Sequence, residues 1–209
     1  MTFEWVKTRD GSLTIYSEKY SETYHSISGA FEEAFKKFAI PCKIKGKMKI
    51  LDICFGLGYN SAAAIKLSKS LKIVGLEKDE EILKAIQKIT VPKFIEKEYK
   101  IIRDAANKLY YKEGDLEIKI VLGDARETIK TLNEKYDAVF LDPFSPKKNP
   151  ELWTTEFLSN VWKRMKNGAI LTTYSCAKIV RKNLSSVGFL VLDGPIVGRR
   201  SPSTIAIRR

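Results

Sequence analysis

The sequence predicts an α/β protein built on a doubly wound, mostly parallel sheet of seven strands, with the last pair antiparallel. From Met48 onward, strand-like apolar segments alternate with helix-like segments, a pattern typical of a parallel sheet covered on both faces. The last two strand-like segments have no helix between them, which indicates an antiparallel pair at the edge. We therefore expect a short N-terminal extension over residues 1–47 and one main domain over residues 48–209.

The extension is predicted to be a hairpin followed by a helix. Two strands, Phe3–Thr8 and Ser12–Ser17, flank the turn-forming pair Asp10-Gly11. Ser28 is expected to cap a helix, because apolar residues recur at helical spacing between residues 30 and 38.

The main domain is predicted element by element from its apolar periods and turn residues. The expected strands are Met48–Ile53, Lys72–Leu76, Ile118–Leu122, Tyr136–Leu141, Ala169–Tyr174, Phe189–Asp193 and Thr204–Arg208. The expected helices are Asn60–Leu67, Asp79–Ile89, Tyr99–Tyr111, Ala125–Leu132, Thr155–Met165, ended by a cap at Asn167-Gly168, and Cys176–Val187.

Composition excludes several classes of protein. Three cysteines and one histidine offer no zinc pattern, so a metal site is not expected, and a catalytic triad would have to use His25. No apolar run approaches the roughly 20 residues that cross a bilayer, and the N-terminus lacks the features of a signal peptide. We therefore expect a cytoplasmic protein without a membrane partner. The net charge of +12 favours a polyanionic partner, although a lysine-rich surface alone would also explain it.

A nucleotide-type ligand is predicted at the carboxyl ends of the first three main-domain strands. The segment Leu51–Asn60 follows the first of them and carries Gly56 and Gly58, which would let a ligand approach the backbone. Glu77 ends the second strand, where an acid can hold ribose hydroxyls, and Asp124 ends the third. Asp124 would equally suit a helix cap. The residues expected to hold the cofactor are Asp52, Phe55, Gly56, Gly58, Asn60, Glu77, Asp124 and Ala125.

This arrangement resembles the Rossmann-like class I fold of S-adenosylmethionine-dependent methyltransferases, in which Cys54 would take the place of the first glycine of the motif acid-x-Gly-x-Gly-x-Gly. The resemblance implies S-adenosylmethionine as the cofactor. The segment Asp142-Pro143-Phe144-Ser145 is similar to the Asp-Pro-Pro-Tyr motif of methyltransferases that act on nitrogen. An ammonium must lose a proton before its nitrogen can attack a methyl group, and a carboxylate at Asp142 could orient the amine and take that proton.

The block from Phe140 to Thr154 is similar to the signature of the tRNA 5-aminomethyl-2-thiouridine methyltransferase family. The resemblance extends to residues 24–26, 29–30, 54–60, 173–175, 180–181 and 198–199. It implies methylation of the aminomethyl group on the wobble uridine in the anticodon stem-loop of tRNA. Many relatives also carry a flavin-dependent oxidase domain, for which 209 residues leave no room, so we expect a stand-alone form.

The charge pattern agrees with an RNA substrate. From Ala177 to Arg209 the chain has seven basic residues and one acid. Basic side chains at a catalytic mouth hold phosphates, and aromatic side chains stack on a splayed base. The residues expected near the substrate are Tyr24, His25, Phe144, Lys147, Lys148, Trp153, Arg181, Arg199 and Arg200, with helix packing as the alternative role of Trp153.

Two rival classes remain open. The first is an enzyme that acts on a small amine, either a methyltransferase or an aminopropyltransferase; the lysines that follow Asp142 argue against a polyamine pocket. The second is a catalytically silent RNA-binding protein on the same fold.

Overall fold

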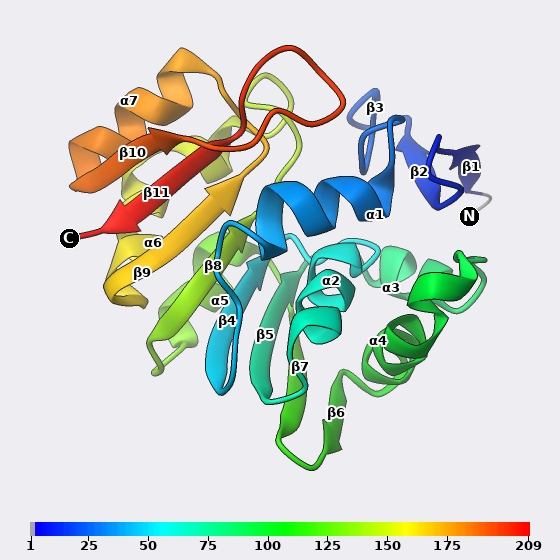
Figure 1. Cartoon of the computed structure of the whole chain (residues 1–209). Coiled ribbons are helices and arrows are strands. Elements are labelled where there is room, and N and C mark those ends of the chain that lie inside the picture. The colour runs from blue at the N-terminus through cyan, green and yellow to red at the C-terminus, as the bar shows by residue number, and fades with distance from the viewer. Residues whose placement is uncertain (1–2) are drawn as a thin grey trace.

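The computed structural model describes residues 3–209 and contains two sheets. The main sheet has eight strands in the order β10-β11-β9-β8-β4-β5-β7-β6, and five of them, β7, β5, β4, β8 and β9, run parallel (Figure 1). Its strands are β4 Met48–Ile53, β5 Leu71–Glu77, β6 Tyr110–Glu113, β7 Leu116–Leu122, β8 Tyr136–Leu141, β9 Met165–Thr173, β10 Phe189–Asp193 and β11 Thr204–Arg208. The predicted α/β class and the antiparallel last pair are confirmed.

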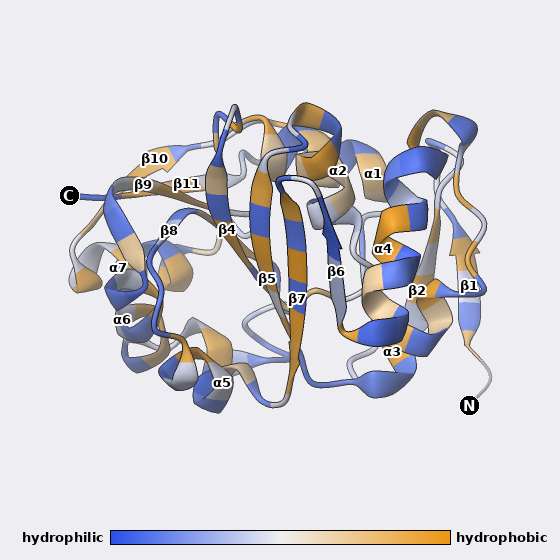
Figure 2. Ribbon diagram, turned by 90° about the horizontal axis from the view of Figure 1, so that it is seen from below, coloured by the Kyte–Doolittle hydropathy of each residue, from blue (hydrophilic) through white to orange (hydrophobic). Residues whose placement is uncertain are grey.

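Helices cover both faces of the main sheet, and each face has its own apolar core (Figure 1). On one face lie α1 Ala30–Glu33, the π-helix η1 Ala34–Ala39, α2 Tyr59–Leu67, α3 Glu80–Ile86, the 3-10 helix η2 Lys93–Ile95 and α4 Glu96–Lys108. On the other lie α5 Ala125–Thr131, the 3-10 helix η3 Pro150–Trp153, α6 Thr155–Lys163 and α7 Lys178–Val187. Figure 2 shows hydrophobic and hydrophilic residues alternating around α4, whose apolar side includes the buried Tyr99 and Ile102.

The prediction of seven strands was wrong, because the expected helix Tyr99–Tyr111 ends early. Leu109 adopts a left-handed backbone conformation that stops α4, and the next residues form β6. β6 and β7 form an antiparallel hairpin around Gly114, which adds an eighth strand at the edge. A four-residue strand whose register depends on its partner has little signal of its own in the sequence.

The Asn167-Gly168 cap was also wrong, since α6 ends at Lys163 and both residues lie within β9. The pairing of β8 with β9 is irregular at this point, and Gly168 supplies the positive φ of 76°. Thr154 caps α6 by accepting a hydrogen bond from the Phe157 amide.

The N-terminal segment forms a three-stranded sheet, β1 Glu4–Lys7, β2 Leu13–Ser17 and β3 Glu22–Thr23, so the predicted hairpin is confirmed with one further strand. The expected Ser28 cap was wrong. The first amides of α1 are bonded instead by the hairpin, with Ser12 accepting from Ala30 and Asp10 from Glu32. The division at residue 47 stays a prediction, although helix η1 packs directly on α2 and β9 of the main domain.

Candidate active site

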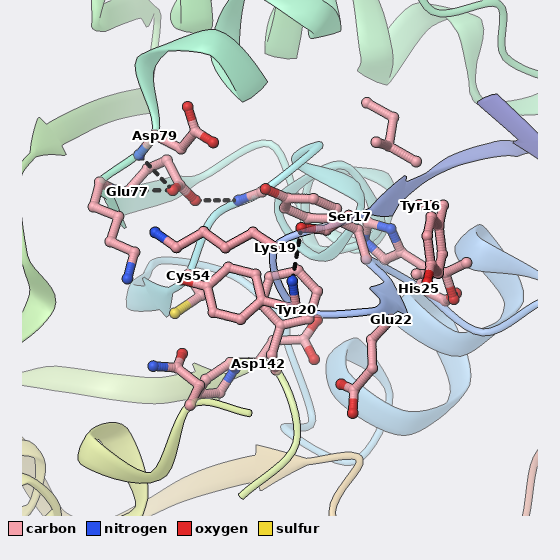
Figure 3. A pocket seen from close by; sticks show the side chains of 18 of the residues that line it. Tyr16, Ser17, Lys19, Tyr20, Glu22, His25, Cys54, Glu77, Asp79 and Asp142 are labelled. Carbon is pink, nitrogen blue, oxygen red and sulfur yellow. Dashed lines mark hydrogen bonds between the residues drawn. The ribbon is translucent and has the colours of Figure 1, made fainter. Parts of the chain in front are cut away.

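A cavity of about 1250 Å³ lies at the carboxyl ends of β4, β5, β7 and β8. Its floor is the point at which chain order along the sheet reverses, with β4 between β5 and β8. Ligands of doubly wound proteins bind at this switch point. The turn between β2 and β3, residues 18–21, covers the cavity from the other side (Figure 3).

The structure brings half of the predicted site residues together in the cavity wall. These are Tyr24, His25, Gly56, Glu77, Asp124, Ala125, Asp142, Phe144 and Arg199. The others lie behind the wall or outside the cavity: Asp52, Phe55, Gly58, Asn60, Lys147, Lys148, Trp153, Arg181 and Arg200.

The Glu77 carboxylate organises the end of the cavity that lies beside the glycine turn and β5. Glu77 Oε2 accepts a hydrogen bond from the Gly56 amide at 2.8 Å, and its Oε1 accepts from the amides of Lys78 and Asp79 (Figure 3). Burial raises the pKa of Glu77, although these three amides favour its charged form. The carboxylate thus fixes the glycine turn and remains in the cavity wall, where its other lone pairs can accept from ligand hydroxyls.

Asp124 caps α5 and faces the same end of the cavity. It accepts from the amide of Arg126, and the Arg126 side chain also bonds both of its oxygens, at 3.0 and 2.6 Å. These hydrogen bonds lower the pKa of Asp124 to about 2, so it is ionised at neutral pH. The capping role that the sequence left open is therefore present.

The glycine turn owes its two glycines to different causes. Gly56 lies in the cavity wall. At Gly58, a Cβ atom would come within 2.5 Å of Ile102 and 3.0 Å of the Phe55 ring, so packing beneath the turn requires this glycine. Phe55 itself is a core residue.

Asp52 is fully buried below the glycine turn, where Ser61 donates a hydrogen bond to its Oδ2. Its Oδ1 has no hydrogen-bond partner among residues 3–209. Burial raises the pKa of Asp52 to about 7. The residue sits behind the cavity wall rather than in it.

The second end of the cavity contains Asp142, directly after β8. Asn60 donates a hydrogen bond from Nδ2 to Asp142 Oδ2 at 2.8 Å. Burial raises the pKa of Asp142 well above its usual range; the charge of Glu33 raises it further, and the Asn60 hydrogen bond and the charge of Lys37 lower it. The side chain of Asn60 therefore orients the Asp142 carboxylate, and its predicted contact with a cofactor stays a prediction.

Aromatic side chains join the β2–β3 turn to the loop after β8. The Phe144 ring stacks on Tyr20 at 4.2 Å and meets the Tyr24 ring edge-on at 4.9 Å. Glu22 accepts hydrogen bonds from the amide and the hydroxyl of Ser145. These contacts hold the turn closed over the cavity.

A model of a protein family described as S-adenosyl-L-methionine-dependent methyltransferase matches residues 86–209. This chain belongs to that family. A solved structure of MnmC2 from Aquifex aeolicus superposes on this chain with a TM-score of 0.87 and is 36% identical to it in sequence. The match covers 99% of this chain and 70% of the MnmC2 chain. Spermidine synthase from Thermotoga maritima shares the fold, with a TM-score of 0.65 at 14% sequence identity. That match covers 100% of this chain and 80% of the synthase chain.

Two curated relatives are longer than this chain. An uncharacterized protein of Methanocaldococcus jannaschii is 37% identical over 97% of this chain and 59% of its own length. The tRNA 5-methylaminomethyl-2-thiouridine biosynthesis bifunctional protein MnmC of Leptospira interrogans is 29% identical over 92% of this chain and 33% of its own length. The chain thus corresponds to about a third of the bifunctional protein.

The cavity of this methyltransferase fits S-adenosylmethionine. An adenosine ligand needs acceptors for ribose hydroxyls and for the adenine amino group, and Glu77 and Asp124 present carboxylates at the ends of adjacent strands. Gly56 and Ala125 keep the wall beside them free of bulky side chains.

Two residues expected near the substrate, His25 and Trp153, are buried and make hydrogen bonds to other residues of this chain. His25 is buried, contacts Thr14 through Nδ1 at 3.2 Å, and meets the Tyr59 ring edge-on. Burial lowers its pKa to about 4, so it is neutral. Trp153 is 2% exposed and donates from Nε1 to the Phe144 carbonyl, which is the packing role.

The basic residues differ in what they contact. Lys147, Lys148 and Arg200 are exposed. Arg199 lies over the Tyr174 ring and bonds the Tyr174 carbonyl at the cavity wall. Arg181 bonds Thr204, the Leu192 carbonyl and Asp193, which ties α7 to the edge strands.

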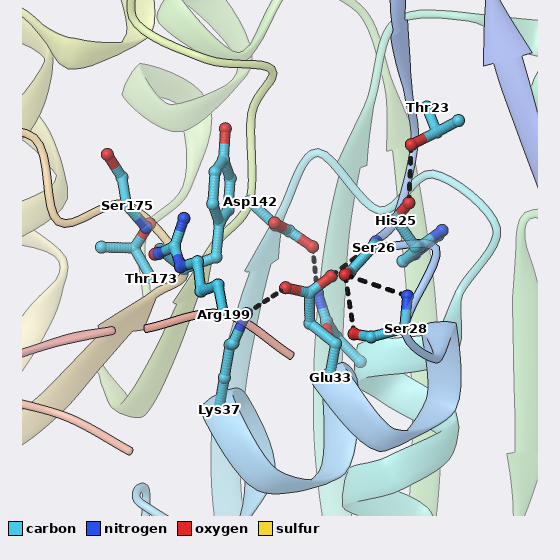
Figure 4. A network of polar contacts seen from close by, with 12 residues as sticks. Thr23, His25, Ser26, Ser28, Glu33, Lys37, Asp142, Thr173, Ser175 and Arg199 are labelled. Atoms are coloured by element: carbon cyan, nitrogen blue, oxygen red, sulfur yellow. Dashed lines mark hydrogen bonds and ion pairs between the residues drawn. The ribbon is translucent and has the colours of Figure 1, made fainter. Parts of the chain in front are cut away.

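Sequence reasoning missed an acidic and basic pair in the cavity wall. Glu33 and Lys37 come from α1 and η1, and Lys37 Nζ bonds Glu33 Oε1 at 2.6 Å (Figure 4). The signal was faint, because Glu32–Lys36 and Glu33–Lys37 have the same spacing of four and only burial separates them. Tyr20 and Glu22, which also line the cavity, lacked any such pattern, and Tyr174 was included only through the resemblance over residues 173–175.

For residues 3–209, no helix is long and apolar enough to cross a membrane, and no cluster of three or more His, Cys, Asp or Glu is placed to bind a metal ion.

Proposed function

We propose that this methyltransferase transfers a methyl group from S-adenosylmethionine to the primary amine of 5-aminomethyl-(2-thio)uridine at the wobble position of tRNA. The observation that carries the proposal is the placement of Asp142, whose carboxylate faces the cavity at the end of β8 and is oriented by Asn60. The relative MnmC is named for the biosynthesis of 5-methylaminomethyl-2-thiouridine in tRNA, which supports the choice of substrate.

Asp142 has the properties that the proposed step needs. An alkyl ammonium has a pKa near 10, so it must lose a proton before its nitrogen lone pair can attack. The raised pKa of Asp142 narrows the gap between the proton donor and the acceptor. When bound, S-adenosylmethionine supplies an electrophilic methyl group on sulfur. Asp142 would first accept the proton of the ammonium and hold the neutral amine, whose nitrogen would then bond the methyl carbon as the carbon–sulfur bond breaks.

The mouth of the cavity suits a nucleotide base that is flipped out of the base stack of the RNA. Phe144 already stacks on one aromatic ring, Tyr20, and a pyrimidine could take that place when the β2–β3 turn opens. Lys147, Lys148, Arg199 and Arg200 would contact backbone phosphates around this mouth.

The test is transfer of labelled methyl from S-adenosylmethionine to an anticodon stem-loop that carries 5-aminomethyluridine, followed by nucleoside analysis. We expect label in 5-methylaminomethyluridine and none in the same stem-loop with unmodified uridine. Absence of label in both RNAs, with cofactor binding verified, would refute the proposal.

One observation favours a second candidate, an aminopropyltransferase. Asp142 and Glu33 are two carboxylates in one cavity, and a polyamine would require such acids. Lys37 neutralises Glu33, however, which weakens this candidate. Incubation with putrescine and decarboxylated S-adenosylmethionine, with detection of spermidine, would distinguish the two functions.

A further inference from the structure

Lys37 is a buried ammonium group in the wall of the active-site cavity. Its side chain is 2% exposed, whereas that of its neighbour Lys36 is 53% exposed. Removing an ammonium from water is costly unless protein or ligand groups replace the lost hydrogen bonds. The contacts of Lys37 therefore bear on what the cavity binds.

The protein satisfies only part of the hydrogen-bonding capacity of Lys37. Its Nζ donates to Glu33 Oε1 at 2.6 Å, and Glu33 Oε2 is occupied by the Ser26 amide at 2.8 Å (Figure 4). An ammonium has three N–H donors. Across residues 3–209, Glu33 is the one acceptor within hydrogen-bonding distance of Lys37, so two donors remain for a ligand.

The backbone that carries Lys37 is unusual. Residues Ala34–Ala39 form a π-helix, closed by a hydrogen bond from the Ile40 amide to the Phe35 carbonyl. Such widened turns are rare and frequently occur at functional sites. This turn places the ammonium at the cavity rather than at the surface.

Lys37 lies at the same end of the cavity as Asp142. Because the proposed methyl transfer would take place there, this end is called the reacting end. The two residues belong to segments about 100 positions apart, and both line the cavity. Figure 4 shows Asp142, Glu33 and Lys37 in one polar network. The charge of Lys37 lowers the pKa of Asp142 while that of Glu33 raises it. This end of the cavity thus presents both a carboxylate acceptor, Asp142, and an ammonium donor, Lys37, with Glu33 between them.

We infer that Lys37 Nζ donates a hydrogen bond to the 4-carbonyl oxygen of the target pyrimidine while Asp142 holds the amine. This inference rests on the proposed function and adds to it the group that selects the base. In 5-aminomethyluridine the 4-carbonyl and the aminomethyl group are on adjacent ring carbons, so one donor and one acceptor at the same end of the cavity match them. Cytosine has an amino group at position 4, so two hydrogen-bond donors, this amino group and the Lys37 ammonium, would face each other.

The test compares two anticodon stem-loops that differ in one nucleoside, 5-aminomethyluridine or 5-aminomethylcytidine. The wild-type protein is expected to favour the uridine substrate by about 100-fold or more in kcat/KM. The double variant Glu33→Gln/Lys37→Met replaces the buried ion pair by neutral side chains of similar shape. We expect the preference to fall at least about 10-fold, while the Kd for S-adenosylmethionine changes less than about 2-fold.

The matched control is Glu32→Gln/Lys36→Met, which removes an ion pair of the same spacing on the exposed side of the helix. It should leave the preference unchanged. If Glu33→Gln/Lys37→Met kept the preference for uridine with cofactor binding intact, the role inferred for Lys37 would be wrong, and the proposed function would stand. No transfer by the wild-type protein to either RNA would overturn the proposed function and this inference with it.

A second variant covers the case in which the double variant loses cofactor binding. Lys37→Arg keeps the positive charge and a partner for Glu33 but moves the donor. It should lower kcat/KM for the uridine RNA about 10-fold at unchanged Kd for S-adenosylmethionine. Unchanged kcat/KM would contradict a direct hydrogen bond from Lys37.

Discussion

The two ends of the cavity hold their carboxylates in opposite ways. At the end proposed to bind the cofactor, called the cofactor end, Glu77 and Asp124 accept hydrogen bonds from main-chain amides close to them in the sequence or in the adjoining turn. At the reacting end, Asp142 has one side-chain donor, Asn60, and shares its surroundings with Glu33 and Lys37 from the N-terminal helix. Many donors keep a carboxylate ionised and rigid, whereas burial with few donors leaves its proton affinity high. The first arrangement suits binding, and the second suits proton transfer.

The largest effect is expected from Asp142→Asn, which keeps the shape of the side chain but removes the proton acceptor. Turnover should fall by about 10²–10⁴-fold, while the Kd for S-adenosylmethionine stays within a few-fold. Single-turnover methyl transfer and calorimetric titration would measure the two quantities.

Asp137→Asn is the control for that variant, because Asp137 lies at the other end of the same strand and pairs with Lys166. It should preserve turnover. If Asp142→Asn weakened cofactor binding as much as turnover, the assignment of Asp142 as the base would be lost.

The next effect concerns stability and the buried Asp52. Its folded-state pKa of about 7 lies above the unfolded value of 3.8, so the native state retains this proton. The stability that it contributes is present below pH 3.8 and is lost as the pH rises through about 7. Asp52→Asn should therefore be more stable than the wild type at pH 8, by about 2–4 kcal/mol, and the difference should shrink toward pH 4.

Urea unfolding between pH 4.5 and 8 would measure the difference. The neutral His25 has the opposite dependence, because its lowered pKa costs stability as the pH falls from 6.5 to about 4, but both proteins contain it and it cancels. Asp115→Asn changes an exposed carboxylate and should give no such trend. A pH-independent difference for Asp52→Asn would show that the native carboxyl is not protonated.

Glu77→Gln tests the cofactor end. The amide retains an acceptor for the Gly56 N–H but loses the negative charge that would face ribose hydroxyls. We expect the Kd for S-adenosylmethionine to rise about 10–100-fold and kcat at saturating cofactor to change only a few-fold. Glu80→Gln, an exposed acid on α3, is the control. A large loss of kcat with unchanged Kd would remove the contrast between the two ends.

Reversal of Arg199 and Arg200 to Glu tests the RNA contacts at the mouth. The Kd for tRNA should rise about 10-fold at low salt and by less at high salt, because the interaction is with phosphate charge. Lys47→Glu/Lys112→Glu makes the same change of charge at the amino end of the sheet. Equal weakening by the two double variants would indicate that net charge, rather than this surface, controls binding.

The sequence predicted the cofactor end better than the reacting end, for a physical reason. The glycine turn, Glu77 and Asp124 follow their strands directly, and strand order alone brings them together. Glu33 and Lys37 line the same cavity as Asp142 because η1 packs on α2 and β9, contacts between distant segments that no local pattern encodes. Asn60 was assigned to the cofactor because its neighbours in sequence are glycines, yet its side chain points to Asp142. Local spacing predicted which segments meet but not which way each side chain faces.

The smallest predicted effect concerns Cys54, which stands where the motif that this segment resembles has its first glycine. Its φ of 65° lies in the left-handed region, which costs a residue with a Cβ atom about 1 kcal/mol. Cys54→Gly should therefore be more stable than Cys54→Ala by up to about 1 kcal/mol, which reverses the ordinary order of these two residues. The same pair of substitutions at Cys42, which has no positive φ, should give the ordinary order. Urea unfolding of the four variants measures both differences, and alanine more stable than glycine at position 54 would show that the turn relaxes when the thiol is removed.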